Sequence, residues 1–464
     1  MTLNTSYTGA EYKRLDYFAT KSSIPLKLSV ALTATGGIFL LLELIGRAQG
    51  SGWQRFLLSF GAISVGATST FYYLYRGTTP GIRNSQLFFR SLTSRGLFAW
   101  GLCVALTGFY VQLYFVDDQR EWFKNLIFIT DPLSMALRDS PADRWFLYGV
   151  VYTLSILVMG MRMLMRYRHS RYHKIRTLSV MFFQLGFAFL IPGFLKGLSG
   201  DEYYLTYFWP LRKEALFPSD VHQLLDRPGY LGTFMVFWGL ISLFLLTPLL
   251  TFFYGKRWYC SWVCGCGGLA ETAGDPFRHL SSKSEGAWIL ERWLIHLVLL
   301  AITLLTLLLW ACSWWEQAFL QEWILKFKTL YGLLIASVFS GVVGVGFYPI
   351  LGSRVWCRFG CPMAAILGAI QRIWSRFRIT TNGDQCISCG NCSTYCEMGI
   401  DVRMYAQRGE NIVRSSCVGC GVCAAVCPRG VLKLENDKPG DRFAGSETPI
   451  SALRSTLLAR QSSG

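Results

Sequence analysis

The chain has 464 residues, of which 52% are hydrophobic and only 16% are charged, and its formal net charge at pH 7 is +17. Soluble domains carry about 25% charged residues, so this composition argues against a chain made only of soluble domains. A basic chain can be a nucleic-acid-binding protein, but here the basic residues lie between long apolar segments, so we expect no nucleic-acid partner.

Eight apolar segments are long enough to cross a bilayer, which takes about 20 residues in a helix. We predict membrane-spanning helices at roughly 25–46, 55–75, 96–116, 145–165, 177–195, 230–253, 293–312 and 330–352. The amino-terminal residues lack a short apolar core with a small-residue cleavage site, so we expect no removable signal peptide. The predicted fold class is an all-α multi-pass membrane protein with a small α+β module near its carboxy-terminal end.

The loops between these segments predict an orientation. Segments 76–95, 166–176 and 353–378 contain basic residues and no acidic residue, whereas segment 117–144 contains six acidic residues. By the positive-inside rule, the basic loops and both termini face the cytoplasm. We therefore expect a protein of the bacterial inner membrane whose carboxy-terminal module is cytoplasmic.

A cysteine pattern follows both the sixth and the eighth predicted span. The segments GKRWYCSWVCGCG (255–267) and GSRVWCRFGCPMAA (352–365) each contain glycine, a basic residue, aromatic residues and then C-x3-C. The pairs are Cys260 with Cys264 and Cys357 with Cys361. On a continuing helix the two cysteines of a pair face the same way, so four thiolates could share an additional metal centre. Cysteines that only pack helices at the interface are the alternative, and Cys266 has no assigned role.

Two cysteine runs near the carboxy-terminal end have the spacing C-x2-C-x2-C-x3-C. With this spacing, three cysteines of each run hold one [4Fe-4S] cluster and the fourth reaches across to the other cluster. The predicted ligands of the first cluster are Cys386, Cys389, Cys392 and Cys427, and those of the second are Cys417, Cys420, Cys423 and Cys396. A zinc site is the alternative, but zinc sites use four ligands in paired C-x2-C units, which fits two matched quartets poorly.

Four regions follow from these segments. They are an N-terminal membrane region of about five spans (1–229), a second membrane region with both C-x3-C motifs (230–378), a two-cluster ferredoxin domain (379–436) and a polar tail (437–464). Residues 363–378 are predicted to form an amphipathic helix that lies on the inner leaflet and tethers the ferredoxin domain. Glu397 stands where a proline usually follows the fourth cysteine.

These motifs resemble those of the membrane-bound polyferredoxin family, which includes membrane subunits or accessory proteins of periplasmic nitrate reductase (NapH), nitrous-oxide reductase (NosR) and cbb-type cytochrome oxidases (CcoG). The resemblance is carried by CSWVC (260–264), CRFGCP (357–362), CISCGNCSTYC (386–396) and CVGCGVCAAVCP (417–428). It implies a protein that passes electrons between the quinone pool or a cytoplasmic donor and a partner enzyme. The first C-x3-C motif departs from the family because Gly265 replaces its proline.

Three functions fit the motifs. The first is electron transfer between a membrane quinol or a cytosolic donor and a redox partner protein. The second is an accessory role in reducing or handling a metal, most plausibly copper, for assembly of a respiratory enzyme, because soft thiolates suit Cu(I). The third is a non-catalytic redox sensor. Whether the protein is itself a quinol-oxidising or metal-reducing enzyme is open at this level.

The remaining polar residues limit the cofactors. Of the five histidines only His296 falls within a predicted span, and no C-x-x-C-H motif occurs, so no haem is expected. Glu291, Arg292 and His296 begin the seventh span and could serve a quinone head group, with an interfacial anchor as the alternative. Glu43, near the end of the first span, is a costly intramembrane charge.

Overall fold

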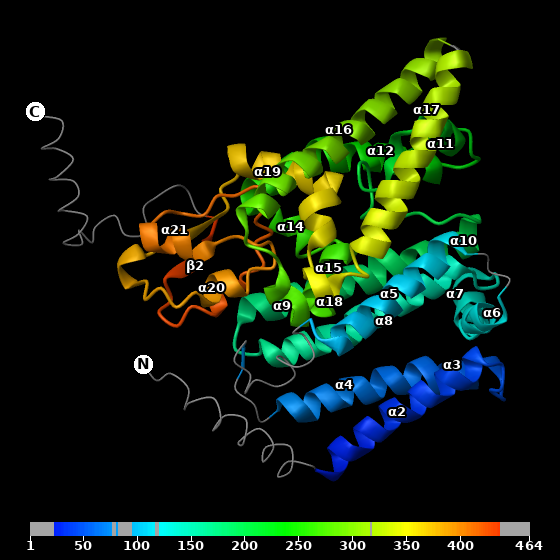
Figure 1. The fold of residues 1–464 in the computed structure, drawn as a ribbon. Coiled ribbons are helices and arrows are strands. Elements are labelled where there is room, and N and C mark those ends of the chain that lie inside the picture. Colours follow the sequence, from blue (N-terminus) through cyan, green and yellow to red (C-terminus); the bar gives the residue numbers. More distant parts are fainter. Residues whose placement is uncertain (1–22, 77–79, 82–94, 117–119, 316–317, 437–464) are drawn as a thin grey trace, which may run out of the picture. The chain divides into compact units, whose positions relative to one another are not determined.

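The computed structural model describes residues 23–76, 80–81, 95–116, 120–315 and 318–436 (Figure 1). The described chain is mainly helical, with one two-stranded sheet near its carboxy-terminal end. Eight helices in this part of the chain are long and apolar enough to cross a membrane. The predicted fold class is therefore confirmed. The predicted polar tail, 437–464, lies outside the described residues.

The first five candidate spans occur where the apolar segments predict them. They are α2 (Ile24–Leu44), α3 and α4 (Gly52–Phe56 and Ala62–Tyr75, joined by a π-helical turn), α5 (Leu97–Phe115), α8 (Arg144–Arg166), and α9 and α10 (Arg171–Phe182 and Ile191–Ser199, joined by a π-helical stretch). Polar caps define two starts: Asp143 accepts from the backbone N–H of Phe146 at 2.7 Å, and Ser170 caps α9.

The other three spans follow the same order. They are α12 and α13 (Leu231–Ile241 and Thr247–Tyr254, joined by a π-helical turn), α16 (Glu285–Trp315), and α17 (Ala318–Tyr331) with its π-helical continuation (Gly332–Val343). The short helices are α6 (Glu121–Phe128), α7 (Asp131–Arg138), α11 (Pro218–Leu225), α14 (Arg257–Cys260), α15 (Gly265–Thr272), α18 (Tyr348–Leu351) and α19 (Pro362–Trp374).

The eighth span differs from its predicted position. It covers Gln321–Val343, whereas the apolar run predicted 330–352. Two lysines lower the hydropathy of its first turns, so the apolar run in the sequence starts later. Lys326 pairs with Glu322 at 2.7 Å, and the Lys328 ammonium lies over the Phe217 ring at 4.9 Å. Because charges near a helix end can be paired in this way, these turns stay helical. The span then ends in turns before α18, which begins with Pro349 in its first turn.

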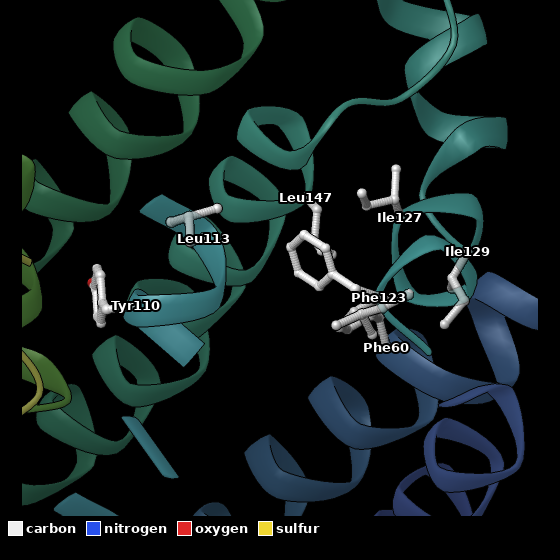
Figure 2. Packing of buried hydrophobic residues seen from close by; sticks show 8 residues of the cluster. Phe60, Tyr110, Leu113, Phe123, Ile127, Ile129 and Leu147 are labelled. Atoms are coloured by element: carbon white, nitrogen blue, oxygen red, sulfur yellow. The ribbon is translucent and has the colours of Figure 1, made fainter. Parts of the chain in front are cut away.

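The chain forms two compact units. One contains Met1–Tyr207, Trp262–Phe277 and Ala336–Ser353, and the other contains Phe208–Ser261, Arg278–Ile335 and Arg354–Gly464. In the first unit, Phe60, Leu113, Phe123 and Leu147 meet in a buried cluster that joins α6 to the spans around it (Figure 2). The predicted loop 117–144 is therefore largely folded, because the apolar face of α6 (Glu121–Phe128) packs inward.

Buried charges in the first unit are paired. Glu43, 1% exposed, accepts from Arg55 Nε at 2.7 Å, so its cost in the membrane is offset by an ion pair. Asp275 pairs with Arg162 at 3.0 Å and also with Arg166. Removing one partner of such a buried pair costs about 3–5 kcal/mol, so the pairs of Asp275 hold segment 262–277 to α8.

In the second unit, a two-stranded antiparallel sheet closes the carboxy-terminal module. Strand β1 (Arg378–Thr381) pairs with β2 (Leu432–Glu435), with Arg378 opposite Glu435 and Thr381 opposite Leu432. Between the strands lie α20 (Asn391–Thr394), α21 (Val402–Arg408) and α22 (Val422–Ala425). The chain therefore enters and leaves the module at adjacent points. The two strands lie near the ends of the segment 379–436, and the four predicted regions stay predictions.

Candidate iron–sulfur centre

The first cysteine quartet surrounds one cavity. Four of the residues that line it are cysteines: Cys386, Cys389, Cys392 and Cys427. Cys427 comes from the second run, so this cavity combines cysteines of both runs. Burial and the neighbouring Cys427 and Cys389 together raise the pKa of the Cys392 thiol to about 11. These four sulfurs are therefore close neighbours around one space.

The second quartet is gathered in the same way. Burial raises the pKa of the Cys423 thiol well above its ordinary value, and negative charge on Cys420, Cys417 and Cys396 adds to this effect, as does Cys392 of the first quartet. Cys396 also accepts a hydrogen bond from the Ile400 backbone N–H at 3.4 Å. Such N–H···S bonds stabilise the sulfur charge of an iron–sulfur ligand. Both quartets thus fit the clusters predicted for them, and the assignment of each ligand stays a prediction.

The two runs share a local backbone. Gly390 (φ 76°) precedes α20, which contains Cys392, and Gly421 (φ 80°) precedes α22, which contains Cys423. The short helix after each glycine turns the third cysteine of the run toward the first two. The repeated C-x2-C-x2-C pattern therefore predicts a repeated loop, and the structure confirms that repetition.

The first C-x3-C segment contacts the second quartet directly. The Lys256 ammonium donates to the Ser415 carbonyl at 3.1 Å, and the Ser261 hydroxyl donates to the Val418 carbonyl at 2.8 Å. Ser415 and Val418 flank Cys417. The start of the first C-x3-C segment, including Ser261 between its cysteines, is thus fixed against the loop that carries three ligands of the second predicted cluster.

Gln371 of α19 fastens the same loop from the other side. Its side-chain amide donates to the carbonyls of Arg414 and Cys417 at 2.6 and 2.9 Å, and its carbonyl accepts from the Lys256 backbone N–H at 2.6 Å. Gln371 is 1% exposed. The predicted amphipathic helix 363–378 therefore ends earlier, at Trp374, and its inner face packs against protein; Ile373 and Trp374 remain exposed.

The second C-x3-C segment contacts the chain around Cys396. The Glu397 carboxylate, which is fully buried, pairs with Arg354 at 3.0 Å and with Arg278 at 3.4 Å. Arg354 Nη1 also donates to the Cys260 carbonyl at 3.3 Å and lies 3.7 Å from the Cys357 sulfur. One guanidinium therefore contacts the ferredoxin module and the first cysteine of both C-x3-C pairs.

The C-x3-C motifs do not lie on continuing helices, so that expectation was wrong. The helix α14 ends at Cys260, and Cys264 is extended (φ −68°, ψ 126°) as the N-cap residue of α15. In the second motif, a π-helical turn ends at Gly360, and Cys361 (φ −81°, ψ 112°) precedes α19. Pro362 explains the second break, because the residue before proline avoids helical backbone.

The same backbone arises in the first motif without a proline. A Cβ atom on Gly265 would lie 2.5 Å from the Tyr207 hydroxyl and 2.6 Å from Gln184 Oε1. A larger residue at this position would require the ends of these two side chains to move. The glycine at position 265 therefore suits the close packing of the first unit.

Both motifs also begin alike. Gly255 (φ 65°, ψ −173°) and Gly352 (φ 94°, ψ 168°) adopt a backbone region that is essentially limited to glycine. Each glycine turns the chain from a helix end toward the cysteines. The internal repeat seen in the sequence is therefore also a repeat of backbone conformation.

The four C-x3-C cysteines are each buried. Cys264 belongs to the first unit, and Cys260, Cys357 and Cys361 belong to the second. Among the described residues, no three His, Cys, Asp or Glu side chains converge as ligands of a single metal ion would. A [4Fe-4S] cube spaces its ligands more widely than a single ion does. A metal centre shared by the four cysteines stays a prediction.

Two of the three residues considered for a quinone head group, Glu291 and Arg292, contact other side chains in the structure. Glu291 pairs with Arg358 at 2.6 Å, and Arg358 also donates to the Ser282 carbonyl at 2.7 Å. The Arg292 guanidinium lies over the Trp288 ring at 5.2 Å. Glu291 therefore anchors the second C-x3-C segment to the start of α16.

Sequence reasoning missed Gln371, Arg354 and Lys256 as residues of the site, and it treated Glu397 only as a missing proline. Arg354 and Lys256 had a signal, because each precedes a C-x3-C pair in the repeated segments. Gln371 had none beyond being a polar residue on the apolar side of an amphipathic helix.

Comparison with known families assigns two iron–sulfur regions. A 4Fe-4S dicluster domain matches residues 378–428, and a 4Fe-4S binding domain matches 236–284 and 331–382. The second domain includes both C-x3-C segments. No solved structure is significantly similar to the chain.

Three curated relatives are similar over part of the chain. YccM of Escherichia coli (strain K12), a candidate electron transport protein by its name, is 28% identical over 32% of this chain and 43% of its own length. The regulatory protein NosR of Stutzerimonas stutzeri is 26% identical over 34% of this chain and 22% of its own. The methylamine utilization ferredoxin-type protein MauN of Methylobacillus flagellatus is 26% identical over 31% of this chain and 50% of its own.

The chain thus spans half or less of the length of each of these relatives. The matched domains and the relatives nevertheless agree on one type of protein. The resemblance to the membrane-bound polyferredoxins is therefore confirmed, and the chain carries 4Fe-4S ferredoxin-type domains together with helices that can span a membrane.

Proposed function

We propose that this protein is a membrane-bound iron–sulfur electron-transfer protein that connects a donor at the membrane with a redox partner protein. The observation that carries the proposal is the direct contact between the ferredoxin module and both C-x3-C segments. Lys256 and Ser261 bind the loop around Cys417, and Arg354 binds Glu397 beside Cys396. Electron transfer needs short, fixed distances, and these contacts hold the module in place.

In this proposal the two quartets hold two [4Fe-4S] clusters. Clusters of this type supply one-electron chemistry. The protein gathers the cysteines, buries Cys417 and Cys423, and donates the Ile400 N–H to the Cys396 sulfur. Because each cysteine must lose its proton to bind iron, the buried thiols release protons when a cluster is assembled.

The C-x3-C cysteines form, in this proposal, an additional metal centre at the membrane side of the second quartet. The contacts of Arg354 with the Cys357 sulfur and the Cys260 carbonyl support a shared site. The same cysteines would suit a copper-handling protein, which is the second candidate function. A quinol is the proposed donor, and the bacterial inner membrane with a cytoplasmic module is the proposed location, because the basic loops favour it.

A single set of purified proteins tests the proposal. We expect the full-length protein in detergent to contain iron and acid-labile sulfide, and to be reduced and reoxidised by a quinol and a soluble acceptor. Cys260→Ser and Cys357→Ser should lose the same additional centre and the reduction by quinol, while the ferredoxin clusters remain. Cys312→Ser, a change in the transmembrane helix α16, is the matched control.

The outcomes separate the candidates. Copper bound stoichiometrically by the wild type and lost in both variants would favour the accessory role. Intact clusters with no turnover toward any quinol, soluble acceptor or metal would favour the sensor. Different metal contents in Cys260→Ser and Cys357→Ser would show that the two pairs are separate sites.

A further inference from the structure

The buried ion pair of Arg354 and Glu397 lies between the second quartet and the C-x3-C pairs. Glu397 directly follows Cys396, and its carboxylate and both of its arginine partners are at most 1% exposed. The same guanidinium of Arg354 also contacts the Cys357 sulfur, which lies 3.7 Å from its Nη1 atom. Three links therefore join a predicted cluster ligand to a C-x3-C cysteine: the bond between Cys396 and Glu397, the ion pair and the contact with sulfur.

Glu397 adjoins the second quartet, because it directly follows Cys396 in the chain. Burial, together with neighbouring negative groups that include Cys396 and Glu397, raises the pKa of the Cys417 thiol to about 11. Glu397 also contributes at Cys396. The neighbours that act on Cys392 of the first quartet are instead Cys427 and Cys389.

A buried charge near a redox group changes its reduction potential, because adding an electron costs more next to a negative charge and less next to a positive one. Screening by water and salt is weak where both partners are buried. The two partners of the ion pair therefore have opposite effects on the reduction potential of a nearby redox group: Glu397 lowers it and Arg354 raises it.

We propose that Arg354 and Glu397 are positioning residues that set the reduction potential of the group held by Cys396, Cys417, Cys420 and Cys423, and that join this group to Cys357. The inference rests on the proposed function, because it requires both quartets to hold clusters. It adds that the second cluster is the one on the membrane side of the electron path, and that its potential is controlled separately from that of the first.

The test is a redox titration of the purified full-length protein, followed by electron paramagnetic resonance. Cys389→Ser and Cys420→Ser, each retaining one cluster, identify the two signals. We expect Glu397→Gln, which removes the negative charge but keeps the shape, to raise the potential of the signal missing from Cys420→Ser. Arg354→Gln should lower the same potential, and the double variant should lie between the two single variants.

A matched ion pair in the same module provides the control. Arg378 and Glu435 pair at 3.7 Å across β1 and β2, with side chains 11% and 9% exposed. Arg378→Gln and Glu435→Gln should leave both potentials unchanged. Arg354→Lys, which keeps the charge, should keep the potential close to that of the wild type. If Arg354→Gln yields too little folded protein to titrate, Glu397→Gln still tests the inference.

Three results would overturn the inference. They are equal shifts of both signals, a shift confined to the signal missing from Cys389→Ser, and unchanged potentials in every Glu397 and Arg354 variant that retains its iron. A wild-type protein without iron would instead contradict the proposed function, so the two failures are distinguishable.

Discussion

The two cysteine quartets have the same spacing and the same local backbone, yet their surroundings differ. Around the first quartet, Cys389 is exposed, and the cavity is lined by the exposed side chains of Arg403 and Arg429. The second quartet is covered by Lys256, Ser261 and Gln371. The cysteine motif determines the local backbone of each quartet. The residues packed around a quartet determine which donors or acceptors can approach it.

This difference suggests a direction for the path. The covered quartet adjoins the C-x3-C segments, whereas the open quartet is accessible to a soluble protein. We therefore expect the second quartet to exchange electrons with the membrane side and the first quartet to exchange them with the partner. The following predictions test this division, beginning with the largest expected effect.

Loss of one ligand should remove one role. Cys420→Ser and Cys389→Ser should each lose one cluster, about four of eight irons. Cys420→Ser should stop reduction by a membrane donor. Cys389→Ser should still be reduced by that donor but should reduce a soluble acceptor slowly. Iron analysis and stopped-flow reduction measure both effects, and identical kinetic defects in the two variants would contradict the division.

Replacing glycine with alanine should destabilise the protein more at Gly399, near the second quartet, than at Gly430, near the first quartet. At Gly399 (φ 66°) a Cβ would lie 2.2 Å from the Ser282 carbonyl oxygen and 2.3 Å from Arg358 Nη1, whereas nothing lies within 4 Å at Gly430 (φ 63°). Gly430→Ala should cost only the backbone strain, about 1–2 kcal/mol. Gly399→Ala should cost about 1–3 kcal/mol more, because the docked segment must move.

The measurement is thermal loss of cluster absorbance in both glycine variants. We expect a lower midpoint for Gly399→Ala than for Gly430→Ala, together with slower reduction by the membrane donor. Equal midpoints would show that the contact between Gly399 and Ser282 does not hold the module.

Loss of the Gln371 side chain should loosen the second quartet. Gln371→Leu leaves two carbonyls and one N–H without their present partner, and each buried group left unsatisfied costs about 1–3 kcal/mol. Partial rehydration of the loop should reduce the total effect to about 2 kcal/mol. Limited proteolysis should then cut near residue 414 faster than in the wild type.

Gln407 offers the matched control on the open side. Its amide donates to the Ser388 hydroxyl at 2.7 Å at an exposed position. Gln407→Leu should change stability by less than about 0.5 kcal/mol, as surface changes usually do. A larger loss in Gln407→Leu than in Gln371→Leu would reverse the comparison of the two quartets.

The smallest expected effect concerns the charges beside the open quartet. Arg403→Gln and Arg429→Gln should slow electron transfer to anionic ferricyanide by a few-fold at low salt, since exposed charges act mainly on association rates and are screened by salt. Transfer to a neutral quinone analogue should not change. Lys433→Gln, on β2, is the control, and an equal effect there would indicate a general charge effect.

The sequence predicted the features that depend on composition and spacing. Eight spans follow from apolar runs, and the crossed grouping of Cys427 with Cys386, Cys389 and Cys392 follows from a repeated motif. The errors have local causes. Lys326 and Lys328 hid the start of the last span, and the extended backbone at Cys264 and Cys361 ended helices that the spacing alone treated as continuous.

Contacts between distant segments were not predictable. Gln371 and Glu397 contact residues far from them in sequence, and no motif around either residue indicates which residue it will contact. A buried glutamate is costly unless it is paired, so its pairing follows from burial, but its burial follows only from the docked structure.

The docking contacts also bear on how the protein is made. Four residues receive the module in these contacts, and all of them precede it in the chain: Lys256, Ser261, Arg354 and Gln371. During synthesis the receiving surface is therefore complete before the cysteine runs leave the ribosome. Cys417 and Cys423 are buried in the folded protein, so we expect iron and sulfide to enter the second quartet before the module settles. Delayed iron supply should then leave chains whose second quartet stays empty, which pulse labelling with radioactive iron would reveal.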